Sequence, residues 1–300
     1  MVGWLAGMLT PLAALLVLAA GIGGAAFPSL QLAYITQPGF DQRVTLYLHD
    51  LTHKLTIVLR DDLIGWGLDI AWSPDGRLIA YSSYHQDAAY RSLYVMDLLT
   101  GGVRRISPED VDSNSPTWSP DGQQIIYQAY IPQTGWDIYR YDLRTGTAHL
   151  VVARPGTDGN PAWSPDGRRI VFESTYIGGQ ADIYLYDLES RAIDRLTDDF
   201  SNETNAVWLP DGEAIVFASR RGGGAYALWQ MHLRDRDLFP LTDGDSATIE
   251  PSISPGGQWV AYVDDRHAGR QLVVQRLDDP TVRRRISGLA AILRQPAFRP

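Results

Sequence analysis

The chain has 300 residues, of which 45% are hydrophobic and 20% charged, and its formal net charge is −9. This balance is typical of a globular protein with a large core and excludes a disordered chain. The acidic charge argues against a nucleic-acid partner, because an acidic surface gains nothing from the release of phosphate counterions. No cysteine occurs, which excludes disulfides, thiol catalysis and cysteine-ligated zinc.

The first 27 residues form an apolar segment, and no charged side chain occurs before Asp41. As a helix, this segment would be about 39 Å long, which is enough to cross a bilayer. Gly24-Ala25-Ala26 resembles the small-residue cleavage site of a secretory signal. We therefore expect residues 1–27 to be either a cleaved signal peptide or a retained transmembrane anchor. A helix buried in the core is the third alternative.

Three strand patterns follow, at residues 32–34, 46–50 and 55–59, and then a motif based on Trp-Ser-Pro-Asp-Gly recurs every 45 or 46 residues. Its copies begin at Trp72, Trp118, Trp163, Trp208, Ile253 and, truncated by the end of the chain, Phe298. In each unit a strand leads into a Pro-Asp-Gly turn, and three more strand patterns follow. Four strands in a unit of about 45 residues are typical of a β-propeller blade.

The first unit contains only the three strand patterns before the first motif, so it lacks an innermost strand of its own. The orphan strand around Phe298 would supply it, and the two chain ends would then pair within one blade. We therefore predict an all-β fold: a six-bladed β-propeller of four-stranded blades over residues 28–300, preceded by the hydrophobic helix. The period-two patterns and the Pro-Gly turns exclude an α-solenoid.

The repeated Trp-Ser-Pro-Asp-Gly, followed by an Ile-Ala-Tyr or Val-Phe strand and then by Asp-Ile-Tyr-X-Tyr-Asp, resembles the WD-type repeat of the TolB-like propellers of bacterial envelopes. The resemblance covers about residues 28–300. It implies a periplasmic or other extracytoplasmic location, at the inner membrane if residues 1–27 are retained. Such repeats indicate the fold and say little about function. We interpret the recurring Asp side chains as turn formers and the recurring Trp side chains as wedges between blades.

A ring of polar residues is predicted at one mouth of the central channel, where the innermost strands begin. Each lies three positions before a Trp-type position: Asp69, Ser115, Asn160, Asn205, Glu250 and Gln295. These side chains either cap the strand starts or bind a ligand, a cation or a loop of a partner. Because all the ligand atoms would be oxygens, a cation held by Asp69 and Glu250 would be Ca²⁺. No other cofactor is expected.

The loops between the second and third strands are predicted to open on the same face as this ring. They are rich in aromatic and arginine residues, which anchor protein interfaces. The candidates are Tyr84, His85, Tyr130, Trp136, Tyr176, Arg220, Arg221, Tyr226, Arg266, His267 and Arg270. The alternative for each of them is an exposed loop residue with local hydrogen bonds.

The sequence contains no nucleophile elbow, no zinc-protease motif and no phosphate-binding loop. We therefore expect a non-enzymatic, monomeric scaffold that binds a protein or peptide and meets a membrane only through residues 1–27. The alternative is an enzyme on a propeller scaffold, a polysaccharide lyase or hydrolase, with a metal or His/Arg site at the channel mouth. Its residues would be His85, His267, Arg220 and Arg266. A third alternative is a structural module of an envelope complex.

Overall fold

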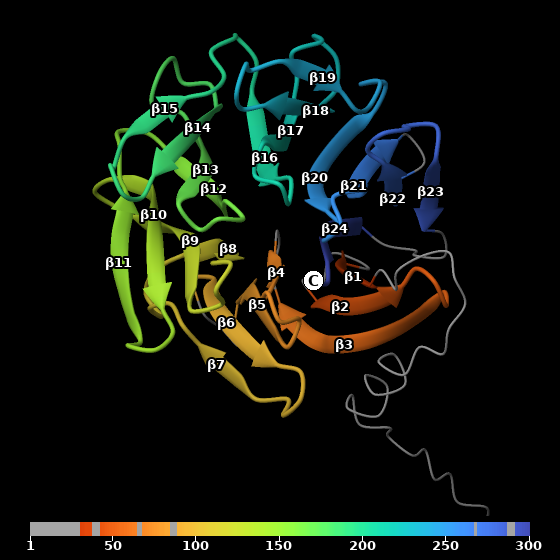
Figure 1. The fold of residues 1–300 in the computed structure, drawn as a ribbon. Coiled ribbons are helices and arrows are strands. Elements are labelled where there is room, and N and C mark those ends of the chain that lie inside the picture. Colours follow the sequence, from red (N-terminus) through yellow and green to blue (C-terminus); the bar gives the residue numbers. More distant parts are fainter. Residues whose placement is uncertain (1–30, 38–42, 65–67, 85–88, 267–268, 287–291) are drawn as a thin grey trace, which may run out of the picture.

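The computed structural model describes residues 31–37, 43–64, 68–84, 89–266, 269–286 and 292–300. In this part of the chain, twenty-four strands form six antiparallel sheets of four strands each. The sheets are arranged as blades around a central axis (Figure 1). The predicted six-bladed propeller is therefore confirmed.

The predicted helix within residues 1–27 lies outside the described residues. Among the residues that the structure does describe, no helix is long and apolar enough to cross a membrane.

The strands of each blade follow one another from the axis outward. Blade 1 consists of β24 (Ile292–Phe298), β1 (Gln31–Gln37), β2 (Arg43–Asp50) and β3 (Leu55–Ile64). Blade 2 consists of β4 (Ile70–Trp72), β5 (Leu78–Ser83), β6 (Ser92–Asp97) and β7 (Val103–Arg105). Blade 3 consists of β8 (Ser113–Trp118), β9 (Gln124–Ile131), β10 (Gly135–Asp142) and β11 (Thr147–Val152).

The remaining three blades repeat this arrangement. Blade 4 consists of β12 (Asp158–Trp163), β13 (Arg169–Ser174), β14 (Asp182–Asp187) and β15 (Ile193–Arg195). Blade 5 consists of β16 (Glu203–Trp208), β17 (Ala214–Ser219), β18 (Ala227–His232) and β19 (Leu238–Pro240). Blade 6 consists of β20 (Ala247–Ile253), β21 (Trp259–Arg266), β22 (Gly269–Arg276) and β23 (Arg283–Ile286).

The ring closes in blade 1, where the two ends of the described chain pair. β24 runs antiparallel to β1, with Leu32 opposite Phe298. The Phe298 side chain is buried in a cluster with Leu32 and Tyr34 of β1 and with apolar residues of blade 6. Because Phe298 touches both blades, the last strand completes blade 1 and joins it to blade 6, as predicted.

The Ser-Pro-Asp-Gly turns of blades 2, 3 and 4 share one local cause. In the first turn, the Asp75 carboxylate accepts hydrogen bonds from the Ser73 hydroxyl and from the Arg77 amide. Gly76 follows with a φ of 66°, in the left-handed region that glycine occupies without strain. The Ser73 hydroxyl lowers the pKa of Asp75 below its usual range. The interpretation of the motif Asp residues as structural therefore agrees with the contacts.

The recurring Trp side chains are buried, as expected for wedges between blades, and they also carry hydrogen bonds between blades. The indole nitrogens of Trp72, Trp118 and Trp208 each donate to a backbone carbonyl of the preceding blade at 3.1 Å. The indole nitrogen of Trp163 is buried without a partner among the described residues. The sequence pattern did not distinguish these two situations.

Candidate functional site: the central channel and its loop face

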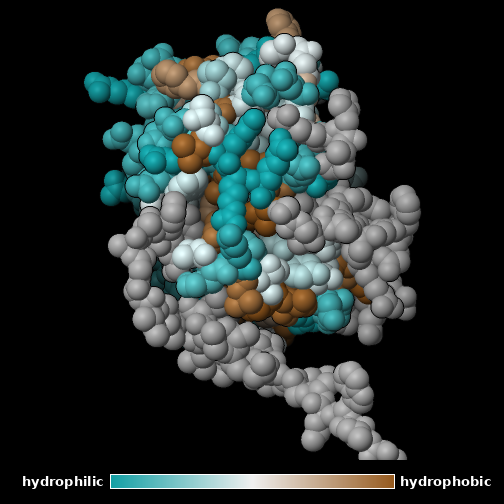
Figure 2. Space-filling model, turned by 90° about the vertical axis from the view of Figure 1, so that its right-hand side faces the viewer, coloured by the Kyte–Doolittle hydropathy of each residue, from teal (hydrophilic) through white to brown (hydrophobic). Residues whose placement is uncertain are grey.

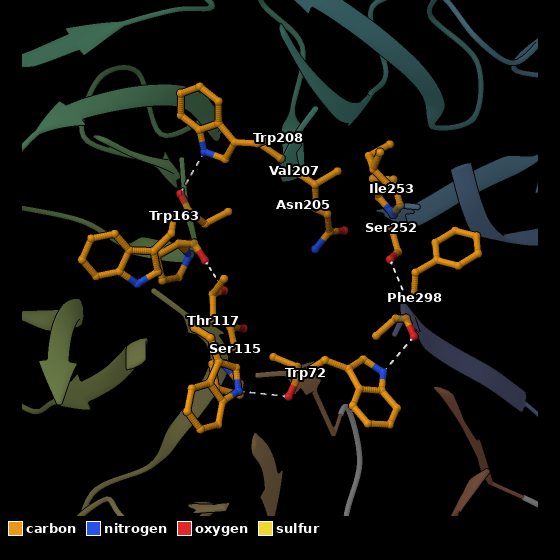
Figure 3. A pocket seen from close by; sticks show the side chains of 18 of the residues that line it. Trp72, Ser115, Thr117, Trp163, Asn205, Val207, Trp208, Ser252, Ile253 and Phe298 are labelled. Carbon is orange, nitrogen blue, oxygen red and sulfur yellow. Dashed lines mark hydrogen bonds between the residues drawn. The ribbon is translucent and has the colours of Figure 1, made fainter. Parts of the chain in front are cut away.

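The innermost strands enclose a central cavity of about 640 Å³, seen from close by in Figure 3. Five of the six predicted ring residues line this cavity: Asp69, Ser115, Asn160, Asn205 and Glu250. The sixth, Gln295, belongs to β24, but its side chain lies outside the described residues. Its neighbour Pro296 lines the cavity. The structure therefore brings together every ring residue whose side chain it describes.

In blades 3 to 6 the ring residue belongs to a β-bulge, which the sequence analysis missed. In β8, for example, Asn114 and Thr117 pair with Gln128 and Ile126, so two residues oppose one. The ring residues of these four blades have φ angles between 45° and 57°, in the left-handed region. Bulges re-aim side chains. Asparagine tolerates this conformation, and serine and glutamate tolerate it less well. In blades 3, 4 and 6 the ring residue is followed by proline, and this was the available signal, because proline inside a strand marks a bulge.

Polar contacts connect the ring residues of neighbouring blades. The Asp69 carboxylate accepts a hydrogen bond from the Ser115 amide at 2.8 Å, which joins blade 2 to blade 3. The Ser115 hydroxyl donates to the Asn160 side-chain oxygen at 2.7 Å, and the Asn160 amide donates to the Gln128 side chain at 2.7 Å. Both of these contacts join blade 3 to blade 4.

Glu173 of β13 contacts the bulge of blade 5 in the same way that Gln128 of β9 contacts the bulge of blade 4. Its carboxylate accepts hydrogen bonds from the Thr204 hydroxyl and, at 3.4 Å, from the Asn205 amide. Burial raises the pKa of Glu173. At the equivalent position of β17 the chain has Ala218, whose side chain cannot accept a hydrogen bond. This type of link therefore joins blade 3 to blade 4 and blade 4 to blade 5, and Ala218 cannot form it between blades 5 and 6.

The register of the strands places the predicted binding loops around the same mouth. The end of each second strand lies beside the start of the innermost strand, as in the pairs Ser174 with Asp158 and Ser219 with Glu203. The loops between second and third strands therefore share a face with the ring, and we call this the loop face. The described candidates on it are Tyr84, Tyr130, Trp136, Tyr176, Arg220, Arg221, Tyr226 and Arg270.

The alternative enzyme site cannot be assembled from the described residues. His85 and His267 lie outside them, and Arg266 is described only by its backbone in β21. Arg220 is exposed, stacks on Tyr226 at 5.7 Å and donates to a backbone carbonyl of its own loop. Among the described residues, no group of three or more His, Asp or Glu side chains could hold a metal ion. The prediction of Ca²⁺ between Asp69 and Glu250 stays a prediction.

Two groups of side chains can be distinguished on the loop face. Arg221 is held by ion pairs with Asp199 at 3.0 Å and with Glu203 at 3.5 Å. Tyr130 and Tyr176, in contrast, are 42% and 48% exposed.

The most exposed large hydrophobic side chain of the described chain is Phe200, at 95%, in the loop between β15 and β16. The sequence analysis missed Phe200, although a hydrophobic residue among turn formers, in Asp-Asp-Phe-Ser-Asn, was a signal.

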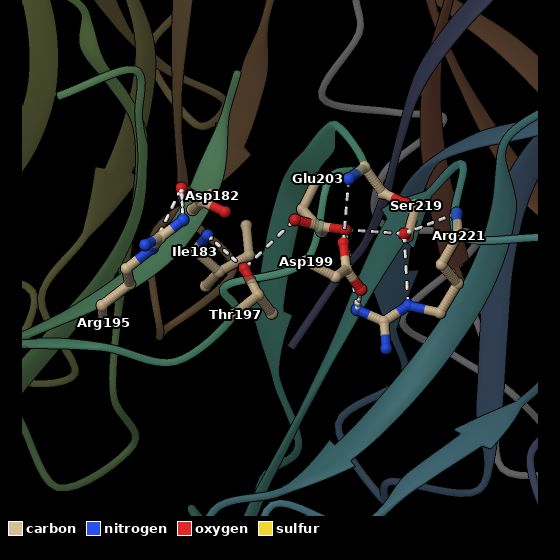
Figure 4. A network of polar contacts seen from close by, with 9 residues as sticks. Asp182, Ile183, Arg195, Thr197, Asp199, Glu203, Ser219 and Arg221 are labelled. Carbon is tan, nitrogen blue, oxygen red and sulfur yellow. Dashed lines mark hydrogen bonds and ion pairs between the residues drawn. The ribbon is translucent and has the colours of Figure 1, made fainter. Parts of the chain in front are cut away.

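A buried polar network fixes the loop that carries Phe200 (Figure 4). Glu203 is fully buried and accepts hydrogen bonds from the Thr197 hydroxyl at 3.1 Å and from the Ser219 hydroxyl at 2.8 Å. Thr197 in turn accepts a hydrogen bond from the Ile183 amide. Burial raises the pKa of Glu203 to about 7. Both ends of the loop are thus tied to blades 4 and 5.

Buried acids of this kind were also missed by the sequence analysis. Asp158 and Glu203 both stand five residues before a Trp-type position, and both are fully buried. Asp158 accepts hydrogen bonds from the backbone amide and the guanidinium of Arg154, which stacks on Tyr176 at 5.0 Å. The recurrence of an acid at this position was the available signal.

The comparisons with known proteins agree with this geometry. TolB from Acinetobacter baumannii is 26% identical over 90% of this chain and 67% of that chain, with a TM-score of 0.79. A putative TolB from Agrobacterium tumefaciens is 19% identical, over 86% of this chain and 89% of that chain, with a TM-score of 0.69. No curated protein sequence matches the chain.

Enzymes also share the fold. An oligogalacturonate lyase in complex with manganese is 16% identical, over 85% of this chain and 78% of that chain, with a TM-score of 0.58. This likeness concerns the fold alone. The family is shown by the sequence itself, because residues 112–283, more than half of the chain, match the family model described as the TolB beta propeller domain. The chain belongs to the TolB beta propeller domain family.

Proposed function

We propose that this propeller is a non-enzymatic scaffold outside the cytoplasm that binds a protein or peptide through its loop face. One observation carries the proposal. Four of the five exposed aromatic side chains in the described chain lie on the loop face: Tyr90, Tyr130, Tyr176 and Phe200. Aromatic side chains are enriched in protein interfaces, so their concentration on one face favours a partner there.

Phe200 has the properties of an anchor residue. Its side chain is 95% exposed, and burial of a phenylalanine in a partner would contribute about 1.5–3 kcal/mol. Its loop is already ordered, because Glu203 and Thr197 hold one another and the Asn202 side chain accepts a hydrogen bond from the Ala181 amide. A rigid loop loses little conformational entropy on binding, which favours affinity.

The location outside the cytoplasm is proposed on two grounds. Residues 1–27 are apolar and uncharged, as in an export signal or membrane anchor. The family is shared with TolB, whose relatives we expect in bacterial envelopes. If the segment is retained, the scaffold is attached to the inner membrane.

The proposal is tested by capturing partners from the native envelope with the full chain. The Phe200→Ala, Tyr176→Ala variant is compared with a Phe239→Ala, Val282→Ala variant, whose exposed residues lie on outer strands or beside them. We expect the loop-face variant to retain less than about a tenth of the captured partner, the loss typical of hot-spot residues. The control is expected to capture the parental amount. Equal capture by both variants would refute the loop face as the binding site.

The enzyme alternative has a direct assay. It is supported by the fold that the chain shares with enzymes such as the oligogalacturonate lyase. The purified chain is incubated with oligogalacturonate, with and without Mn²⁺, and unsaturated products are followed by ultraviolet absorbance. We expect no product above the level of a heat-denatured sample. Release of product would overturn the non-enzymatic assignment.

A further inference from the structure

Among the described residues, the outer strand of each blade has one edge without a neighbouring strand. Proteins commonly protect such edges with charged residues or proline, which prevent pairing with another chain. Five of the six described outer strands have this protection. β3, β7, β15 and β23 each contain two or three charged residues, and β19 ends at Pro240. Figure 2 shows the flank of blades 6 and 1, where hydrophilic side chains extend across hydrophobic patches.

The outer strand of blade 3 is the exception. β11 has six residues, Thr147–Val152, and contains neither proline nor a Lys, Arg, Asp or Glu residue. Its first four residues are exposed, and Leu150, at 55%, is the most exposed large hydrophobic residue of the described chain after Phe200. Thr147 and His149 are hydrogen-bonded on one face of the strand, so Ala148 and Leu150 lie on the other.

We propose that β11 pairs antiparallel with β11 of a second copy of this chain and forms a two-fold symmetric dimer. In such a contact the same residues of both copies meet, so a charged strand would face its own charges. β7 and β23, with their consecutive arginines, are unsuited to self-pairing for this reason. β11 carries no charge and brings the exposed Leu150 side chains of both copies onto one face of a continuous sheet. The proposed dimer differs from the monomer expected from the sequence.

The proposal is independent of the proposed function, because it uses the outer rim and not the loop face. The contact is expected to be weak. A single strand pair is a small interface, and each copy carries a net charge of −9, which opposes association. The affinity will therefore depend strongly on the few residues of β11.

The chain has no cysteine, which permits a clean test by disulfide cross-linking. Single cysteines are placed at each position from Thr147 to Val151 in the full chain and oxidised in the native envelope. Residues closest to the two-fold axis of an antiparallel pair have Cα atoms about 4.5–5.5 Å apart, within the range of a disulfide. We expect cross-linked dimer to peak at one position and fall on both sides. The matched controls are cysteines at Ile193, Asp194 and Arg195 of β15.

A second substitution confirms the strand as the contact. Leu150→Lys, added to the best cross-linking variant at another position, is expected to lower the dimer yield at least tenfold. Ile193→Lys is expected to leave it unchanged. Both side chains are exposed, so the melting temperature should be retained. Absence of dimer from all β11 cysteines, equal yields from β15, or an adduct with a protein of different mass would overturn the proposal.

Discussion

Neighbouring blades meet differently on two sides of the ring. Between blades 2 and 3, the Trp118 indole donates to the Ala71 carbonyl, and the Ser115 amide donates to the Asp69 carboxylate. Between blades 5 and 6, Ile253 takes the place of the tryptophan, and Ala218 stands where Gln128 and Glu173 stand in blades 3 and 4. The second joint is filled by an apolar cluster in which Val216, Leu228, Val260 and Tyr262 are buried.

The difference shows which parts of the repeat are required. The turn and the strand register are present at both joints, whereas the hydrogen bonds between blades change place. Between blades 5 and 6, the Thr248 amide donates to the Tyr226 carbonyl at 2.7 Å, and the Gln275 side chain donates to the Leu241 carbonyl at 2.8 Å. A hydrogen bond contributes about 1 kcal/mol net, which equals the burial of about 40 Å² of apolar surface. Apolar packing can therefore replace the indole hydrogen bond and the hydrogen bonds at the ring without loss of stability at the joint between blades 5 and 6. The hydrogen bonds at the ring join blades 2 to 5, the part of the propeller that carries Tyr130, Tyr176 and Phe200.

The largest effect is expected where the ring closes. Deletion of residues 296–300 removes Phe298, which packs between blades 6 and 1, together with its strand pairing. Loss of a buried phenylalanine alone costs about 3–5 kcal/mol. We expect the melting temperature to fall by roughly 10 °C or more. Deletion of the exposed Pro300 alone is the control and should have little effect. An unchanged melting curve for the longer deletion would refute the closure of the ring by β24.

A pH dependence is expected at the joint between blades 4 and 5, where Glu203 is buried. Its pKa is raised from 4.5 to about 7, so the folded state holds a proton that the unfolded state releases. The stability contributed by this proton is complete below about pH 4.5 and is lost as the pH rises towards 7. We expect the melting temperature to fall by several degrees over this range, and Glu203→Gln to reduce the fall.

The joint between blades 5 and 6 gives the contrast for this titration. It has Thr248 at the position of Glu203, hydrogen-bonded to the Thr242 hydroxyl at 2.8 Å. Thr248→Val should therefore lower stability equally at pH 5 and pH 8. A parent protein and a Glu203→Gln variant with the same pH profile would contradict the assignment of the titration to Glu203.

A smaller difference in stability is expected between substitutions of Trp118 and Trp163. Trp118→Phe loses a hydrogen bond to the preceding blade, whereas Trp163→Phe removes an indole nitrogen that has no partner in the described part of the chain. Both side chains are buried to a similar degree, so the cost of the lost ring volume is comparable. We expect Trp118→Phe to be less stable than Trp163→Phe by about 1 kcal/mol in urea unfolding. Equal values would show that the indole bonds do not distinguish the joints.

The smallest effect concerns Ca²⁺ in the channel. Asp69 belongs to blade 2 and Glu250 to blade 6, so a shared ion would connect these two blades at the mouth of the channel. Free Ca²⁺ at about five times its Kd would stabilise the fold by about 1 kcal/mol. The Asp69→Ala, Glu250→Ala variant should lose this increment. No rise in the melting temperature of the parent would refute the Ca²⁺ site.

Much of the fold could be predicted because each blade repeats the same local chemistry. The 45-residue spacing and the orphan strand at Phe298 indicated six blades and their closure. The position three residues before each Trp placed five described ring residues in the channel. These features depend on residues close together in the chain, and a repeat makes them visible.

The features that the sequence analysis missed depend on contacts between strands and blades. The left-handed φ of Asn205 results from a bulge in strand pairing, and no proline follows this residue to indicate the bulge. The exposure of Phe200 depends on the path of its loop over Glu203 and Ser219. His85 and His267 lie outside the described residues, so the His/Arg site of the enzyme alternative stays a prediction.

The most direct test of the binding role places a photo-crosslinking amino acid at single positions of the full chain in its native envelope. Benzoylphenylalanine at Phe200 or Tyr176 reports on the loop face, and at Phe239 it reports on an outer strand. We predict an adduct with a protein partner from Phe200 and Tyr176 and none from Phe239. An adduct from Phe239 without one from the loop-face positions would contradict the account.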